Sequence, residues 1–291
     1  MNFYLPDFTR HLNLNLYIIQ LLREHPEYFY DYINIGAIYG AFGGSIWNGG
    51  RVIPGIVSKP KVKETIEQIN NLNIPIRFTY TNHLLTEEDL HDKYCNMTLD
   101  IANNGMNEII INSPILENYL REKYPNFKYI LSTTRCERNI EKINEATKNY
   151  DLVVLDYRDN KNLSFLMNIE DKQKIEILIN AYCNPDCPRR KEHYDTLARI
   201  QLNYGENIPE QDRKFDNCPT YGRNIYDILH FSTVLSNEEI QNTYSSMNFS
   251  NFKIEGRTIS TVDLIESYVY YLIKPEWRDR VRIMLLKHCV K

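Results

Sequence analysis

Short apolar runs alternate with amphipathic stretches along most of the chain. The runs are four to eight residues long, which is typical of strands buried on both faces, and the amphipathic stretches repeat their apolar positions at helical spacing. The expected strands are 32–39, 74–81, 108–112, 128–132, 152–157, 175–181, 228–234 and 252–255. Because an expected helix follows each strand, the strands should be parallel and joined by right-handed crossovers.

Eight such units predict an α/β fold, a (β/α)8 TIM-type barrel, since this architecture uses about 250 residues. We expect a single domain over 1–291, with an N-terminal helix at about 9–25, the barrel at about 32–272 and a C-terminal helix at about 277–288. A doubly wound open sheet is the alternative.

Composition narrows the class of protein. Hydrophobic residues make up 43% of the chain and charged residues 25%, as in ordinary globular proteins, and the net charge of −4 indicates no strong nucleic-acid surface. No apolar run approaches the roughly 18 residues of a membrane span, and the first residues do not form a signal peptide. A cytoplasmic protein without a membrane partner is expected.

Polar residues gather where the expected strands end, which is the face of a barrel that carries the active site. The glycine-rich segment 40–51 follows the first expected strand and is either a binding lip or a plain loop. Asp156 and Glu255 are candidates for acid–base or arginine-orienting roles, or for halves of structural ion pairs, and Arg257 follows closely. The candidate substrate-binding residues are Trp47, Asn48, Arg51, Asn82, His83, Arg135 and Arg158.

Four of the six cysteines fall on the same expected face. Cys183 and Cys187 form a C-x₃-C pair after strand 175–181, Cys136 follows strand 128–132, and Cys218 lies in the loop before 228–234. Four converging thiols suit either a 4Fe–4S cluster or structural zinc. Two alternatives stay open: His193 could replace Cys136 as a ligand, or the thiols could bind no metal.

Several segments occur in an order that resembles the collagenase-like peptidase family U-32, over about residues 33–271. They are Thr79–Leu85, Asn112–Pro114, Tyr124-Pro125 with Leu131–Thr134, Tyr182–Cys187, and Phe252–Arg257, in which Lys-Ile-Glu-Gly-Arg is the most specific part. The resemblance implies a TIM-type barrel. It also implies either a four-cysteine 4Fe–4S cluster used in oxygen-independent hydroxylation of RNA bases or quinone precursors, or peptidase activity.

The chain departs from this family in two respects. The peptidase signature, a Glu-x-Phe segment followed by a glycine- and cysteine-rich cluster, is absent, which weakens the case for peptidase activity. The added C-terminal domains of larger members are also absent, which leaves room for a partner protein subunit. A C-x₃-C pair occurs in some single-domain members of the hydroxylation type, so Cys183 and Cys187 carry over from the resemblance.

Three hypotheses follow. The first is a cytoplasmic barrel that holds an iron–sulfur cluster through Cys183, Cys187, Cys218 and Cys136, beside a small organic or RNA-derived substrate bound by arginines. The second is a metal-free peptidase or hydrolase that uses Glu255, Asp156 and His83. The third is a non-catalytic binding subunit with a zinc-clipped loop.

Overall fold

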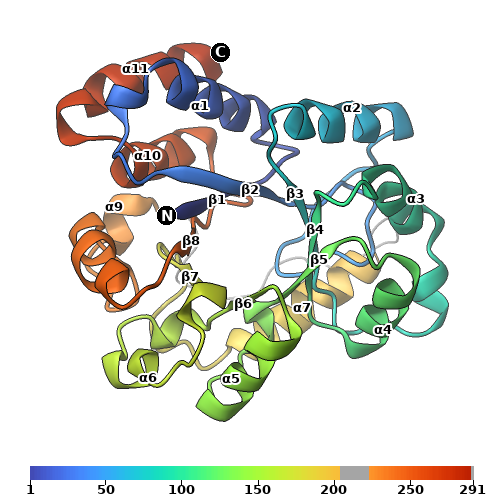
Figure 1. Cartoon of the computed structure of the whole chain (residues 1–291). Coiled ribbons are helices and arrows are strands. Elements are labelled where there is room, and N and C mark those ends of the chain that lie inside the picture. Colours follow the sequence, from blue (N-terminus) through green and yellow to red (C-terminus); the bar gives the residue numbers. More distant parts are fainter. Residues whose placement is uncertain (204–222, 290–291) are drawn as a thin grey trace.

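The computed structural model describes residues 1–203 and 223–289, in which eight parallel strands form a closed barrel (Figure 1). Neighbouring strands pair in chain order, and the last strand closes the barrel on the first through Asn2–Asn251 and Phe3–Phe252. The predicted (β/α)8 barrel is therefore confirmed, and the open sheet is excluded. The strands are β1 (Asn2–Pro6), β2 (Asn34–Gly40), β3 (Ile76–Tyr80), β4 (Glu108–Ile111), β5 (Lys128–Leu131), β6 (Leu152–Val154), β7 (Ile175–Leu178) and β8 (Asn251–Lys253).

Helices surround the barrel (Figure 1). Local sequence sets several of their starts: Ser113 caps a helix that has Pro114 at its first position, and Ser260 caps another. The last helix packs against the first and against the helix before it, which joins the two ends of the chain. The helices are α1 (Leu12–Glu24), α2 (Lys59–Asn70), α3 (Lys93–Ala102), α4 (Pro114–Lys123), α5 (Ile140–Asn149), α6 (Leu163–Met167), α7 (Arg190–Leu202), α9 (Ile225–Ile228), α10 (Thr261–Leu272) and α11 (Arg278–Cys289).

The first strand of the barrel precedes every strand predicted from the sequence. β1 contains Phe3, Tyr4 and Leu5, all buried, and lies between β2 and β8. Five residues at the start of the chain are too few to show a period, so the segment gives little signal of its own. The strand predicted at 32–39 is consequently the second strand of the barrel.

The strand predicted at 228–234 is wrong. Asn224 and Asp227 form a capping box, in which each side chain accepts a backbone N–H of the other's segment, and this starts the short helix α9. Val234 and Leu235 are buried after it, and the Leu235 amide donates to Ile179 O at 2.9 Å. Their apolar character therefore reflects packing beside β7 rather than a place in the sheet.

Side chains alternate along each strand between the helices and the barrel interior. On β3, Phe78 joins the core beneath the helices, whereas Arg77 points inward. Arg77 Nε lies 2.6 Å from Glu108 Oε2, and its Nη1 contacts Glu176. Glu176 Oε1 in turn lies 3.1 Å from Lys253 Nζ. A buried network of two cations and two carboxylates thus crosses the barrel.

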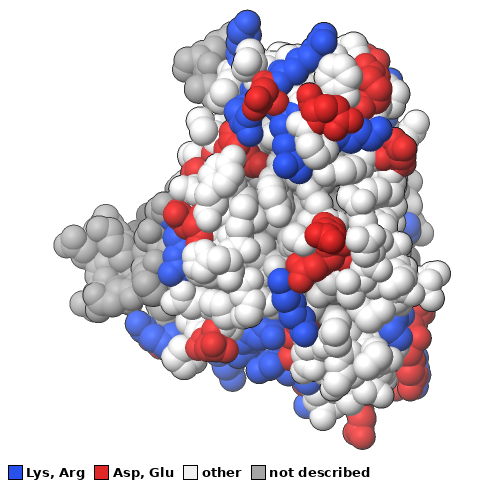
Figure 2. Space-filling model, turned by 90° about the vertical axis from the view of Figure 1, so that its left-hand side faces the viewer, with Lys and Arg blue, Asp and Glu red and all other residues white. Residues whose placement is uncertain are grey.

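The outer surface shows both signs of charge. On the face drawn in Figure 2, acidic and basic side chains are interspersed among uncharged ones, and several of both signs gather at the top. Within 1–203 and 223–289, none of the helices combines the length and the apolar character that crossing a membrane requires.

Candidate functional site

A cavity opens at the carboxyl ends of the strands, where the sequence placed the site. Its floor is apolar and comes from the barrel interior, through Ile110, Val154 and Leu178. Its walls carry hydroxyl, phenol and charged groups from the ends of the strands, from the segments that follow them and from the start of α7. They are Tyr39, Gly50, Arg51, Thr79, Thr81, Ser132, Thr133, Thr134, Tyr182, Cys183, Arg190, His193, Tyr194, Lys253, Glu255 and Arg257.

Arg257 is a cavity cation held by neutral groups. Its Nη1 donates to Thr79 Oγ1 at 2.7 Å and to Asn48 Oδ1 at 3.1 Å, and its Nη2 donates to Gly49 O at 3.0 Å. Among the described residues it forms no ion pair with a carboxylate. Burial, with a smaller contribution from the neighbouring charge of Arg51, lowers the pKa of Arg257 to about 10. The guanidinium is therefore desolvated, and the carboxylates of Asp7 and Glu255 act on it only from a distance, without a direct ion pair within the described residues.

The backbone around Arg257 is tightly constrained. A Cβ on Gly49 would lie 2.6 Å from Thr81 C, and a Cβ on Gly256 would lie 2.6 Å from Pro6 Cγ. Thr258 has φ 73°, which is rare for a β-branched residue. Strain of this kind persists only where the surrounding packing enforces it, so the backbone that carries Arg257 is held in place by the fold.

Arg51 and Glu255 neutralise each other close to Arg257. The Arg51 guanidinium pairs with Glu255 Oε1, and Glu255 Oε2 accepts the Tyr182 amide at 3.3 Å. Two predicted site residues thus meet in the cavity. Glu255 is also half of an ion pair, which was the alternative interpretation of its carboxylate.

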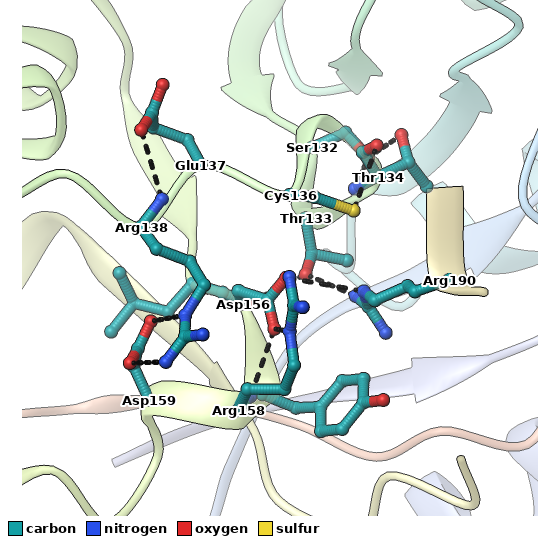
Figure 3. A network of polar contacts seen from close by, with 12 residues as sticks. Ser132, Thr133, Thr134, Cys136, Glu137, Arg138, Asp156, Arg158, Asp159 and Arg190 are labelled. Carbon is teal, nitrogen blue, oxygen red and sulfur yellow. Dashed lines mark hydrogen bonds and ion pairs between the residues drawn. The ribbon is translucent and has the colours of Figure 1, made fainter. Parts of the chain in front are cut away.

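Asp156 is the centre of a second network (Figure 3). Arg158 binds it through two bonds, Nε to Oδ1 at 2.9 Å and Nη2 to Oδ2 at 2.8 Å. Arg190 approaches from α7, with Nε 3.3 Å from Asp156 Oδ2 and Nη2 donating to Thr133 Oγ1 at 3.0 Å. Asp156 and Arg158 therefore act on the cavity through Arg190, which lines it.

The Asp156 network predicts a loss of stability in acid. Burial alone would raise the pKa of Asp156, but its hydrogen bond from Arg158 and the charge of Arg190 outweigh burial and lower it. A depressed carboxyl pKa stabilises the fold above the unfolded value of about 3.9, and this contribution disappears as the pH falls through the folded pKa. Urea unfolding between pH 7 and pH 2 should show Asp156→Asn losing less stability below about pH 4 than the unmodified chain. The exposed control Asp31→Asn should follow the unmodified chain. The prediction would be contradicted if the free energy of unfolding changed with pH in the same way for all three proteins.

Arg190 was missed as a site residue. Arg189-Arg190-Lys191 reads in sequence as a solvated first turn of a helix, yet Arg190 is only 5% exposed and its guanidinium lies 4.2 Å from the centroid of the Tyr157 ring. A triplet of like charges does not reveal which member points inward. The available signal was the position of Arg190, just after the Cys-Pro turn at the end of a strand.

The electrostatic character of the cavity is positive. Burial and the charges of Arg51, Arg190 and Arg189 lower the pKa of His193 to about 4, so its imidazole is neutral near pH 7. Thr81 Oγ1 is buried without a hydrogen-bond partner in the described structure. The site therefore offers desolvated donors to an acceptor that carries negative charge.

The thiols only partly converge. Cys183 lines the cavity, and burial, together with the nearby Cys187, raises its pKa to about 11. Cys136 has a left-handed backbone, and burial raises its pKa beside Arg190. Cys218 lies outside the described residues. Within the described ranges, no three His, Cys, Asp or Glu side chains come together in an arrangement that could hold a metal ion.

Of the seven predicted substrate-binding residues, Arg51 lines the cavity and the other six do not. Trp47 is fully buried and donates Nε1–H to Asp89 O at 2.7 Å, and Asn82 bonds to Ile46 O and Ala198 O. His83 Nε2 lies 2.6 Å from Asp195 Oδ1. Arg135 lies in a separate groove between α4 and α5. Asn48 is buried behind the cavity wall and acts as a support for Arg257.

Comparison with known proteins bears on the fold. No protein-family model matches the chain, and no curated protein matches it. A solved structure described as that of the U32 peptidase Mk0906 is similar, with a TM-score of 0.53 at 13% sequence identity, over 88% of this chain and 93% of that one. The sequence resemblance to the U-32 family is thus accompanied by a shared barrel fold.

Proposed function

We propose that this chain is a barrel enzyme that binds a small organic anion, a carboxylate or a phosphate, in the cavity at the carboxyl ends of its strands. The observation that carries the proposal is Arg257, a desolvated guanidinium with neutral partners only among the described residues. Leaving such a charge buried is costly unless a countercharge binds it.

The lining favours an organic ligand over a bare ion. The apolar floor offers contacts to carbon atoms, whereas hydroxyls of Thr79, Thr81 and Ser132 stand on the walls. A mostly apolar pocket with a few converging polar groups is typical of small-molecule sites. The pocket lies at the carboxyl ends of the barrel strands, where enzymes of this fold have their active sites, and this position favours catalysis over ligand binding alone.

A metal-free peptidase is less well supported. The three residues considered for that reaction lie in separate ion pairs: Glu255 with Arg51, Asp156 with Arg158 and Arg190, and His83 with Asp195. A general base needs a proton donor of the substrate within hydrogen-bond reach, and its activity falls when arginine holds its lone pairs.

Thermal melting in the presence of anions tests the proposal. A ligand that binds the folded state alone stabilises it by about 2.7 kcal/mol at a hundred times its Kd. Pyruvate or inorganic phosphate should raise the Tm above that measured in sodium chloride of equal ionic strength. The control variant Arg199→Gln, at an exposed position on α7, should respond like the unmodified chain. An equal Tm in all three salts would overturn the proposal.

A second candidate function keeps the iron–sulfur expectation, because Cys183 faces the cavity and has Cys187 close by. Metal binding would draw the proton from the Cys183 thiol, whose burial raises its pKa without metal. In that case the cluster would support oxygen-independent hydroxylation, with Cys183, Cys187, Cys218 and Cys136 as the ligands to test.

Anaerobic purification followed by iron, sulfide and zinc analysis decides this question. A cluster gives about four irons and four sulfides per chain. Cys183→Ala should lose them, whereas Cys289→Ala, at the end of α11, should keep them. One zinc per chain would favour the zinc-clipped binding subunit. An anaerobic preparation without iron or zinc would contradict both metal hypotheses.

A further inference from the structure

Lys253 places a primary amine in the cavity. It is the last residue of β8, its side chain points into the barrel interior, and it is 7% exposed. It lines the same cavity as Arg257, four residues further along the chain. The anion-binding function described above makes no use of this amine.

The surroundings of the amine make it a weaker base than an exposed lysine. Within the described ranges its one carboxylate partner is Glu176, whose Oε1 lies 3.1 Å from Nζ. Glu176 also pairs with Arg77, so two cations share one negative charge. Burial, followed by the like charges of Arg77 and Arg257, lowers the pKa of Lys253 to about 8 against the opposing effect of Glu176. A buried amine of this kind is a nucleophile near neutral pH.

Glu176 presents one carboxylate oxygen to this amine; burial would raise the pKa of Glu176, but the charges of Arg77 and Lys253 outweigh burial and lower it. Its Oε2 is held by Arg77, whereas its Oε1 faces Lys253 Nζ and has no hydrogen-bond partner among the described residues apart from this ion pair.

We propose that Lys253 is a catalytic nucleophile that forms an imine with a 2-oxo acid. The inference rests on the proposed function, since Arg257 would hold the acid group. In a 2-oxo acid the carbonyl carbon is bonded directly to the acid carbon, so an acid on Arg257 brings the carbonyl to the part of the cavity that contains Lys253. Both side chains line this cavity, and the charge of Arg257 acts on Lys253.

The step balances without an oxidant or a reductant. The Nζ lone pair attacks the carbonyl carbon, a C–N bond forms, and the C=O bond becomes C–O. One Nζ proton passes to the oxygen to give the carbinolamine, whose hydroxyl then leaves as water with the second Nζ proton as the C=N bond forms. The products are one imine and one water from one amine and one carbonyl.

Trapping with pyruvate and sodium cyanoborohydride tests the proposal, with the labelled residue identified by peptide mass spectrometry. The peptide that contains Lys253 should gain one reduced pyruvate, whereas the exposed Lys61 should not. Lys253→Arg, which keeps the charge, should abolish this label while its melting curve stays cooperative. The control Lys61→Arg should label fully. Acetone, a carbonyl without an acid group, should label Lys253 at least tenfold less.

The outcomes separate the two proposals. If pyruvate raises the Tm and the Lys253 peptide stays unlabelled, the imine is overturned and anion binding survives. Labelling spread equally over exposed lysines would overturn the imine as well. If pyruvate neither raises the Tm nor labels the chain, both proposals fail.

Discussion

Arg77→Met should lower the free energy of unfolding by about 3–5 kcal/mol, the largest stability effect that we expect from a single substitution in this chain. Arg77 is fully buried and lies 2.6 Å from Glu108 Oε2, in contact with Glu176 and 3.9 Å above the centroid of the Tyr4 ring. Its removal leaves Glu108 without this partner and leaves Glu176 to Lys253 alone. Urea unfolding monitored by circular dichroism measures the change.

A matched set of variants shows whether charge causes the loss. Lys63→Met removes an exposed ion pair with Glu67 and should cost less than about 1 kcal/mol. Adding Glu108→Gln and Glu176→Gln to Arg77→Met should recover part of the loss, because the carboxylates are then neutral. If the single variant is as stable as the unmodified chain, the interior network contributes nothing to stability.

Arg257→Gln should weaken the binding of pyruvate by about 10- to 100-fold, since hydrogen bonds to charged groups contribute about 1.5–3 kcal/mol each. The amide can still bond to Thr79 or Asn48, so the fold should survive the substitution. The affinity of Arg257→Lys should lie between those of Arg257→Gln and the unmodified chain, because an ammonium keeps the charge and loses the two-pronged geometry. Isothermal titration calorimetry measures the three affinities.

The control for this result is Arg199→Gln, which removes a cation from the exposed side of α7. Its affinity for pyruvate should equal that of the unmodified chain at a fixed salt concentration. Equal affinities for Arg257→Gln and the unmodified chain would place the anion elsewhere, for example at Arg51 or Arg190.

Much of the fold could be predicted because buried parallel strands are short apolar runs separated by amphipathic helices. The prediction failed where this signal is weakest. β1 has five residues and no room to show a period, and the run 228–234 is apolar because Val234 and Leu235 pack beside β7. The two errors offset each other, so the number of strands was right while Cys136 follows the fifth strand and Cys183 the seventh.

The place of the candidate site followed from the topology, since carboxyl ends of parallel strands must meet at one end of a barrel. Which side chains enter the cavity did not follow. Trp47 and Asn82 stand beside strand ends and are used in packing, whereas Arg190, among charged neighbours, points inward. Lys253 was seen only as part of a family-like segment. The direction of a side chain depends on the pleat of its strand or on its position around the helix axis. The identity of a single residue does not reveal either.

A crystal structure of the chain grown with pyruvate tests the central claim most directly. The account predicts density for the acid in the barrel cavity, with its oxygens within hydrogen-bond distance of the Arg257 guanidinium. It would be contradicted by a cavity without pyruvate in which a carboxylate of the chain itself pairs with Arg257.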